Sequence, residues 1–193
     1  MDAASVIALL NTAVPGADFE PQAPADQPTV VVPRDCLLET CRALREHPAL
    51  RFTLLADVTA VDWWPREPRF EVIYHFASVE GPVKSRLRVK VRLGGEDAHL
   101  ATVKDVWPSA NWLEREVWDL FGIVFDEHDD LRRILLPDDW EGYPLRKDYP
   151  VQIKMTPKGY EPLQLTEQEF QANLDADRHA RGGSKRDRGR SSR

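Results

Sequence analysis

Two segments near the middle of the chain alternate apolar and polar side chains with the two-residue period of a β-strand. In "VKSRLRVKVRL" (residues 83–93) the apolar side chains face one way, and five Lys or Arg side chains at positions 84–92 face the other. The preceding "RFEVIYHFASV" (69–79) alternates in the same manner, and "EGP" at 80–82 separates the two runs. We therefore predict an antiparallel hairpin that packs one face against a core and leaves the other face polar.

A sheet with one apolar face has to bury it against a second layer. Helices are predicted at residues 3–11, 34–47 and 112–121, and further strands at 29–32 and 50–64. The fold class that follows is α+β, a two-layer domain with a mixed or antiparallel sheet and packed helices over residues 1–150. An extended, partner-binding strap is expected at 151–177, where 166–176 have the pattern of a short helix. Residues 178–193 form a basic tail that is expected to be disordered.

The helix predicted at Trp112–Phe121 shows both of its ends in the sequence. Asn111, followed three residues later by Glu114, has the form of a capping box, and Gly122 suits the residue that ends a helix. The predicted buried stripe consists of Leu113, Val117, Leu120 and Phe121.

Four other side chains of this helix fall outside that stripe. Arg115 and Asp119 lie four residues apart on the opposite face, and Trp112 and Trp118 also lie off the stripe. Large aromatic side chains at a surface are common anchors of protein interfaces. We therefore interpret Trp112 and Trp118 as interface residues.

The distribution of charge restricts the classes of partner. The chain carries a net charge of −6, but residues 178–193 hold seven Lys/Arg against one Asp, so residues 1–177 carry −12. Such an acidic body argues against general nucleic-acid binding, which needs a basic surface. The basic strand at residues 84–92 lacks exposed aromatic neighbours on which bases could stack, so we interpret it as a solvated or partner-facing surface. A nucleic-acid-binding domain that uses this strand and the Arg-rich tail is the alternative from a different class.

The N-terminus and the cysteines bear on location. The first residues have no basic segment and include Asp2, so a secretory signal is not expected. No apolar run approaches the ~20 residues that a membrane span needs. Cys36 and Cys41 would point about 140° apart on a helix, and we interpret them as two reduced thiols of a cytosolic protein.

The sequence patterns of catalytic and cofactor chemistry are missing from the chain. It has no Gly-rich dinucleotide or phosphate loop, no HExxH and no four-cysteine set for an iron–sulfur cluster. Glu114 and Glu116 would lie about 200° apart around a helix, so they could not act on one bond as an acid/base pair. Glu116 and Asp119 could join His128 at a metal, but we interpret these side chains as partners of nearby arginines, Arg115, Arg132 and Arg133. We therefore expect a structural component without a catalytic, metal or cofactor site.

A cationic segment without helical pattern follows. "PLRKDYP" (residues 144–150) comes directly after "LRRILLPDDWEGY" (131–143), and its prolines favour extended backbone. We call residues 131–150 the ribbon. We interpret it as a stiff docking segment whose acidic partners lie partly in the chain's own helix and partly on another protein. Its site residues are four cations and the last polar residues: Arg132, Arg133, Arg146, Lys147, Asp148 and Tyr149.

"EREVWDLFGIVFDEHDDLRRIL", running into "LPDDWEGYPLRKDYP", closely resembles the signature of the C subunit, the 30 kDa-type subunit, of the proton-translocating NADH–quinone oxidoreductase (NDH-1), respiratory complex I. Residues 29–107 match this family more loosely, in the order of elements and in "ADVTAVDW". Asp129 departs from the family, in which Pro often follows the His, and the tail after Gln171 has no counterpart. The matching motif positions are Glu114, Arg115, Glu116, Asp119, Leu120, Phe121, His128, Arg132, Ile134, Leu135 and 142–150.

The resemblance implies a peripheral protein at the cytoplasmic face of the bacterial cell membrane, in the hydrophilic arm of the complex. Its implied function is to scaffold the quinone-reducing module, so that electrons pass from NADH through iron–sulfur clusters to quinone, coupled to proton translocation. FMN, the iron–sulfur clusters and quinone would be held by or between partner subunits. The expected partners are chiefly the large D subunit, with the B, I and G subunits nearby, and no nucleic acid. The equivalent component of a membrane-bound hydrogenase or photosynthetic NDH-type complex is the alternative within the same class.

Overall fold

The computed structural model describes residues 2–23, 26–79, 85–150 and 172. Residues 1–151 form one compact unit, and the description below concerns that unit. Of the predicted strap and tail only Ala172 is described, as helical, so the expectations for 151–177 and 178–193 otherwise lie outside the described residues. No helix in the described ranges is both long and apolar enough to cross a membrane.

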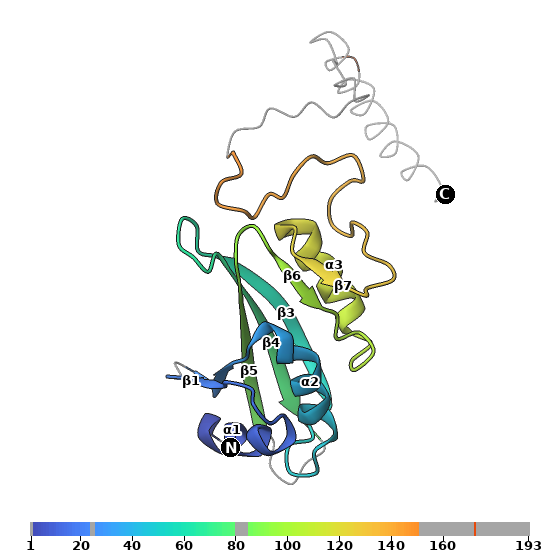
Figure 1. Cartoon of the computed structure of the whole chain (residues 1–193). Coiled ribbons are helices and arrows are strands. Elements are labelled where there is room, and N and C mark those ends of the chain that lie inside the picture. Colours follow the sequence, from blue (N-terminus) through green and yellow to red (C-terminus); the bar gives the residue numbers. More distant parts are fainter. Residues whose placement is uncertain (1, 24–25, 80–84, 151–171, 173–193) are drawn as a thin grey trace, which may run out of the picture. The chain divides into compact units, whose positions relative to one another are not determined.

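Five strands form a mixed sheet in the order β1 (Glu20–Gln22), β2 (Thr29–Val31), β5 (Ser85–Leu93), β4 (Phe70–Ser78) and β3 (Leu54–Asp62) (Figure 1). β2 and β5 run parallel, and the other neighbours run antiparallel. β4 and β5 pair over their whole length, with Val72 opposite Val91 and Tyr74 opposite Val89. The predicted hairpin and the mixed sheet are confirmed.

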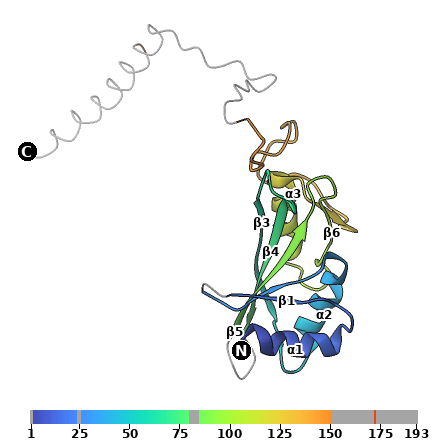
Figure 2. The ribbon, with the colours of Figure 1, turned by 60° about the vertical axis from the view of Figure 1, so that its left-hand side comes forward.

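The second layer is helical. α1 (Ala3–Ala13), α2 (Leu37–Glu46) after the short 3₁₀ turn η1 (Arg34–Cys36), and α3 (Ala110–Phe121) bury apolar side chains in one core with the sheet. Figure 2 shows α2 and α3 on the same side of the sheet. Asp2 caps α1, since its carboxylate accepts the N–H of Ser5 at 2.9 Å. The predicted two-layer α+β fold is therefore confirmed.

The cations of β5 lie on the face of the sheet that points away from this core. Each of three pairs with a carboxylate of the chain: Arg88 with Asp26, Lys90 with Glu71 and Arg92 with Glu20, at 3.0, 2.8 and 3.0 Å. These three cations are thus neutralised within the chain, while positions 83 and 84 lie outside the described residues.

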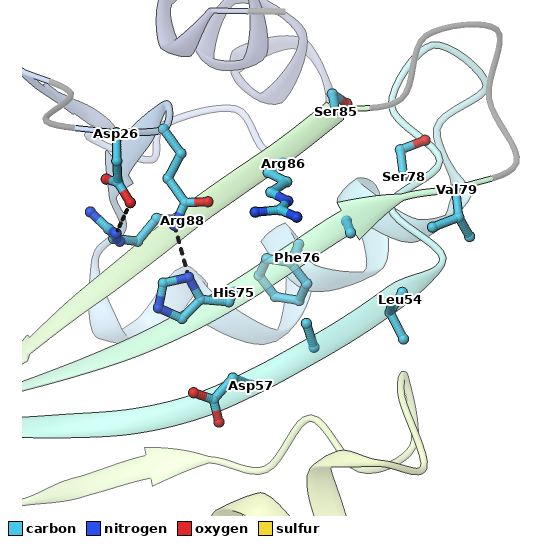
Figure 3. A pocket seen from close by; sticks show the side chains of 13 residues that line it. Asp26, Leu54, Asp57, His75, Phe76, Ser78, Val79, Ser85, Arg86 and Arg88 are labelled. Atoms are coloured by element: carbon cyan, nitrogen blue, oxygen red, sulfur yellow. Dashed lines mark hydrogen bonds and ion pairs between the residues drawn. The ribbon is translucent and has the colours of Figure 1, made fainter.

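A hollow of about 900 Å³ opens on this face at one end of the sheet (Figure 3). Its walls combine exposed apolar side chains, Leu54 and Val79, with polar ones. Two of the polar groups contact others within the hollow, Asp26 with Arg88 and His75 with Gln27.

Three short strands are not among the predicted elements. They are β1 and the parallel pair β6 (His99–Ala101) and β7 (Val124–Asp126). Each contains three residues, which is too few for a two-residue period to be recognised in a sequence.

The start of α3 corrects the capping-box prediction. The helix begins at Ala110, and Ser109 at its N-cap makes no side-chain cap hydrogen bond. Glu114 instead accepts the N–H of Val103 at 2.8 Å, from the segment before the helix. The C-terminal prediction is confirmed, because Gly122 has a φ of 71° and a Cβ there would collide with the Tyr143 ring.

Candidate interaction site

α3 buries charged side chains on two sides. Glu114 and Asp119 are fully buried and Arg115 is 5% exposed. The face with Arg115 and Asp119, opposite to the predicted stripe, is therefore not a solvent face, because the ribbon covers it. The predicted apolar stripe is half right, with two members buried and two only partly buried: Val117 and Phe121 against Leu113 and Leu120.

Asp119 holds the start of the ribbon. Its Oδ2 accepts the N–H groups of Ile134, Leu135 and Leu136 at 3.0, 2.8 and 2.9 Å. Its Oδ1 pairs with the Arg133 guanidinium at 2.7 Å. Burial alone would raise the pKa of Asp119, but these donors outweigh burial and hold the pKa below its usual range.

Two arginines bind backbone carbonyls of the ribbon. Arg115 donates to the carbonyls of Arg132 and Arg133, both at 3.1 Å. Its guanidinium carbon lies 5.1 Å from the centroid of the Trp112 ring. Arg133 also donates to the Trp140 carbonyl at 2.7 Å. Because the ribbon has no regular ladder of its own, these guanidinium groups supply donors that its carbonyls would otherwise lack.

Arg146 binds the C-terminal end of α3. Its Nε donates to the Phe121 carbonyl, and its Nη2 donates to the Gly122 carbonyl at 3.3 Å. The guanidinium lies 4.7 Å from the Tyr143 ring centroid and 5.3 Å from that of Phe70. A cation at this end of a helix is favoured by the helix dipole. Arg146, like Arg133, is thus engaged within the chain.

A second set of charges joins the ribbon to the sheet. Asp62, at the end of β3, accepts two hydrogen bonds from Arg69 at 3.0 and 2.8 Å, and one from the Lys147 N–H at 2.8 Å. Arg69 also donates twice to Asp148, at 2.7 and 3.1 Å. Burial would raise the pKa of Asp62, but the Arg69 and backbone donors lower it to about 2.

Asp62 and Arg69 are residues of this site that the sequence patterns do not single out. Asp62 lies inside "ADVTAVDW", whose spacing indicates no charge pair, and Arg69 directly precedes the strand β4. Their partner Asp148 is 79 residues away from Arg69 in the chain. No local spacing could have revealed this contact.

Glu114 forms a separate buried site with Thr102, Val103 and His128. Its carboxylate accepts from the Thr102 hydroxyl, and its Oε2 lies 3.9 Å from the His128 Nε2. Burial raises the pKa of Glu114 to about 7, and the Thr102 and Val103 donors oppose this only in part. His128 also contacts the Asn111 carbonyl through Nε2 at 3.3 Å.

The raised pKa of Glu114 makes stability depend on pH. Between about pH 4.5 and 7 the unfolded chain has released this proton and the folded chain retains it, so stability falls as pH rises. The loss reaches up to about 3 kcal/mol and levels off above pH 7. Glu114→Gln should remove this slope, as measured by urea unfolding from pH 5 to 8. The control is Glu116→Gln, on the exposed side of α3, and an unchanged slope in the Glu114→Gln variant would contradict the assignment.

The other predicted interface residues differ in exposure. Trp112 is 59% exposed, whereas Trp118 is partly buried against the core. Arg132 is exposed and pairs with Asp130 at 2.8 Å, and Lys147 and Glu116 are exposed. The Tyr149 hydroxyl donates to the Glu141 carbonyl at 3.2 Å. Within the described ranges, no group of three or more His, Cys, Asp or Glu side chains is arranged to hold a metal ion.

Known proteins resemble this chain across the site. A family model described as "Respiratory-chain NADH dehydrogenase, 30 Kd subunit" matches residues 30–154. The chain is 46% identical over 145 residues to the NADH-quinone oxidoreductase C subunit numbered 2 of Rhizobium meliloti, covering 74% of this chain and 78% of that protein. It is 53% identical over 125 residues to the NADH-quinone oxidoreductase C subunit of Geobacter sulfurreducens, covering 64% of this chain and 75% of that protein.

Two solved structures share the fold. The trypsin-resistant fragment (1-134) of Nqo5 has a TM-score of 0.53 at 39% identity, covering 65% of this chain and 98% of that chain. A chain of the membrane-bound sulfane sulfur reductase, an archaeal respiratory membrane complex, has a TM-score of 0.63 at 31% identity, covering 77% and 85%. The family match includes α3, the ribbon and the strands that hold it. The chain therefore belongs to the family of the 30 kDa subunit of respiratory-chain NADH dehydrogenase, whose members include the C subunits of NADH-quinone oxidoreductases.

Proposed function

We propose that this chain is a non-catalytic structural subunit in the hydrophilic arm of a bacterial NADH–quinone oxidoreductase, at the cytoplasmic face of the membrane. It scaffolds the quinone-reducing module and binds no FMN, iron–sulfur cluster or quinone itself. The observation that supports the proposal is that the buried charged side chains of the α3 motif form their bonds within the chain. Glu114, Arg115 and Asp119 are buried and bonded to backbone or side chains of the chain itself, so they shape a surface. Catalytic groups would need access to a substrate.

The surface that these charges shape is proposed to bind the large D subunit, with the B, I and G subunits nearby. Because Arg133 and Arg146 are engaged within the chain, the cations left to bind a partner are the exposed Arg132 and Lys147. Trp112, near the start of α3, is an exposed aromatic side chain of the same motif. Truncating one partner of a desolvated interfacial charge pair costs on the order of 2–5 kcal/mol.

Charge reversal tests this interface. In a bacterium from which the C subunit has been deleted, the variant Arg132→Glu/Lys147→Glu should yield at least tenfold less assembled complex than the wild-type chain. The measurement is a native gel of membranes, with NADH:quinone activity on the same samples. Arg42→Glu/Arg45→Glu, on the exposed side of α2, is the matched control. Normal assembly of the ribbon variant would contradict the proposed contact.

A second candidate is the equivalent component of another complex I-like membrane enzyme, such as a membrane-bound hydrogenase. The similarity to a chain of the sulfane sulfur reductase complex favours keeping it. Affinity purification of the tagged chain from its native cells separates the two, because the electron-donor subunits that accompany it differ. Co-purification of NADH-oxidising subunits would support the NADH–quinone oxidoreductase. Co-purification of hydrogenase subunits would support the other complex I-like enzyme.

A further inference from the structure

The loop between β3 and β4 exposes two tryptophans. Trp63 and Trp64 are 41% and 49% exposed, and neither belongs to the α3 motif or to the ribbon. Figures 1 and 2 both show this loop at the end of the sheet where the ribbon lies, away from α1. Exposed indoles of this kind are rare on monomers and enriched at the centres of interfaces.

The loop and the ribbon are held by the same carboxylate. Asp62 accepts the N–H of Trp64 at 2.9 Å and the N–H of Lys147 at 2.8 Å. The N–H of Trp63 donates to the Arg69 carbonyl at 2.7 Å. The backbone that carries both indoles is therefore fixed beside Lys147, and little conformational entropy would be lost there on binding.

Three carboxylates near the indoles are bonded within the chain. Asp62 and Asp148 pair with Arg69, and Glu67 accepts N–H groups from Arg69 and Gly95. The Arg66 and Lys147 side chains are exposed, and neither makes an ion pair within the described part of the chain. The loop presents two indoles and the Arg66 guanidinium, and the ribbon adds the Lys147 ammonium beside them, while the three carboxylates accept hydrogen bonds within the chain.

A hollow of about 290 Å³ lies beside Trp63. The hollow is lined by Trp63, Arg66, Glu67, Pro68, Phe70, Glu71 and Arg92. Of its other charged side chains, Glu71 pairs with Lys90 and Arg92 with Glu20, and Glu67 accepts the backbone N–H groups of Arg69 and Gly95. The hollow can receive a side chain of a partner, with the Arg66 guanidinium at its wall to meet a carboxylate.

We propose that these four residues, Trp63, Trp64, Arg66 and Lys147, form a docking surface, the indole tip, for another protein of the complex. The partner surface is an apolar groove with carboxylates at its rim. This inference rests on the proposed function, because it needs a complex in which to dock.

The tip fits a protein better than a lipid surface. Indoles with neighbouring cations also occur on membrane-binding surfaces, but stable electrostatic binding there needs several cations, and the tip has two. A hollow beside one indole adds shape complementarity that a fluid lipid surface would not use.

Removal of both indoles tests the docking surface. Trp63→Ala/Trp64→Ala in the full chain should lower its retention in the purified complex at least tenfold after a wash at 200 mM salt. The matched control is Leu54→Ala/Val79→Ala, which removes two similarly exposed apolar side chains, 44% and 52%, at the other end of the sheet. Circular dichroism and thermal unfolding of the isolated variants should match those of the wild-type chain, so that lost retention reports docking.

Photo-crosslinking identifies the partner chemistry. With p-benzoylphenylalanine in place of Trp64, irradiation of the purified complex should crosslink the chain to a peptide rich in Asp or Glu from another subunit. The same probe at position 79 should not. Crosslinks to lipid, or tryptophan-dependent binding of the chain to vesicles with 30% phosphatidylglycerol, would overturn the protein partner in favour of a membrane.

The outcomes separate this inference from the proposed function. If the wild-type chain enters no NADH–quinone oxidoreductase, the proposed function fails, and the inference fails with it. If the wild-type chain assembles and the tryptophan variant is retained equally well, only the inference is overturned.

Discussion

Asp119→Ala is expected to lower the free energy of unfolding by about 3–5 kcal/mol, the usual cost of leaving a buried charge without its partner. The substitution removes the acceptor of three backbone N–H groups, those of residues 134–136, and the counter-charge of Arg133. Each buried donor left unpaired adds its own desolvation cost. Urea unfolding followed by circular dichroism and tryptophan fluorescence measures the change.

The loss should be specific to the buried carboxylate. Glu116→Ala, three residues earlier on the exposed side of the same helix, should change stability by no more than about 0.5 kcal/mol. Asp119→Asn should fall between the two, because the amide keeps one acceptor oxygen and loses the charge. A change below about 1 kcal/mol for Asp119→Ala would show that the ribbon does not depend on this carboxylate.

Arg69→Ala is expected to have the second-largest effect, on the order of 3 kcal/mol, because it leaves the buried Asp62 carboxylate without its cation. Trypsin should then cut at Arg146 or Lys147 faster than in the wild-type chain, because Asp148 also loses its partner. Arg66→Ala removes a cation from the same loop at an exposed position and should change neither stability nor cleavage.

The loss of folding stability at acid pH provides an independent check on the pair that Arg69 forms with Asp62. The pKa of Asp62 is lowered from 3.8 to about 2 in the folded chain, so Asp62 stabilises the fold at neutral pH. This contribution, about 2 kcal/mol, is lost as the pH falls from about 4 to about 2. In Arg69→Ala this loss of unfolding free energy at acid pH should disappear. An unchanged loss would argue against the Asp62–Arg69 pair.

The parts of the fold that have a local period were predictable. The alternation in 69–93 indicates the hairpin and its core face, because a strand with one buried side has to alternate. The helix at α3 and its end at Gly122 were predictable from helical spacing and from the residue that ends it. The short strands β1, β6 and β7 were not, because three residues are too few to show a two-residue period, and β2 was recognised only by its run of β-branched residues.

The sequence patterns single out the charged residues of α3 and the ribbon but not Asp62 and Arg69, and they do not give the geometry of the site. Helical spacing put Arg115 and Asp119 on the face opposite to the core stripe, and that face is buried because the ribbon covers it. Glu114 has the spacing of a capping residue, but it binds Thr102 and Val103 from the preceding segment. A chain segment without periodicity can thus form a third packing layer that local patterns do not reveal.

The contact between the sheet and the ribbon also forms late during synthesis of the chain, because its two sides are far apart in the sequence. Lys147 is 85 residues downstream of Asp62, and ribosomes add about 5–20 residues per second, so Asp62 waits between about 4 and 17 s for this donor. During that interval Arg69 has one of its two carboxylates, since Asp148 has not been made. The nascent hairpin therefore carries its exposed indoles on a loop that is fastened at one side only. Synthesis of Lys147 and Asp148 supplies the remaining bonds, which join the base of this loop to the ribbon.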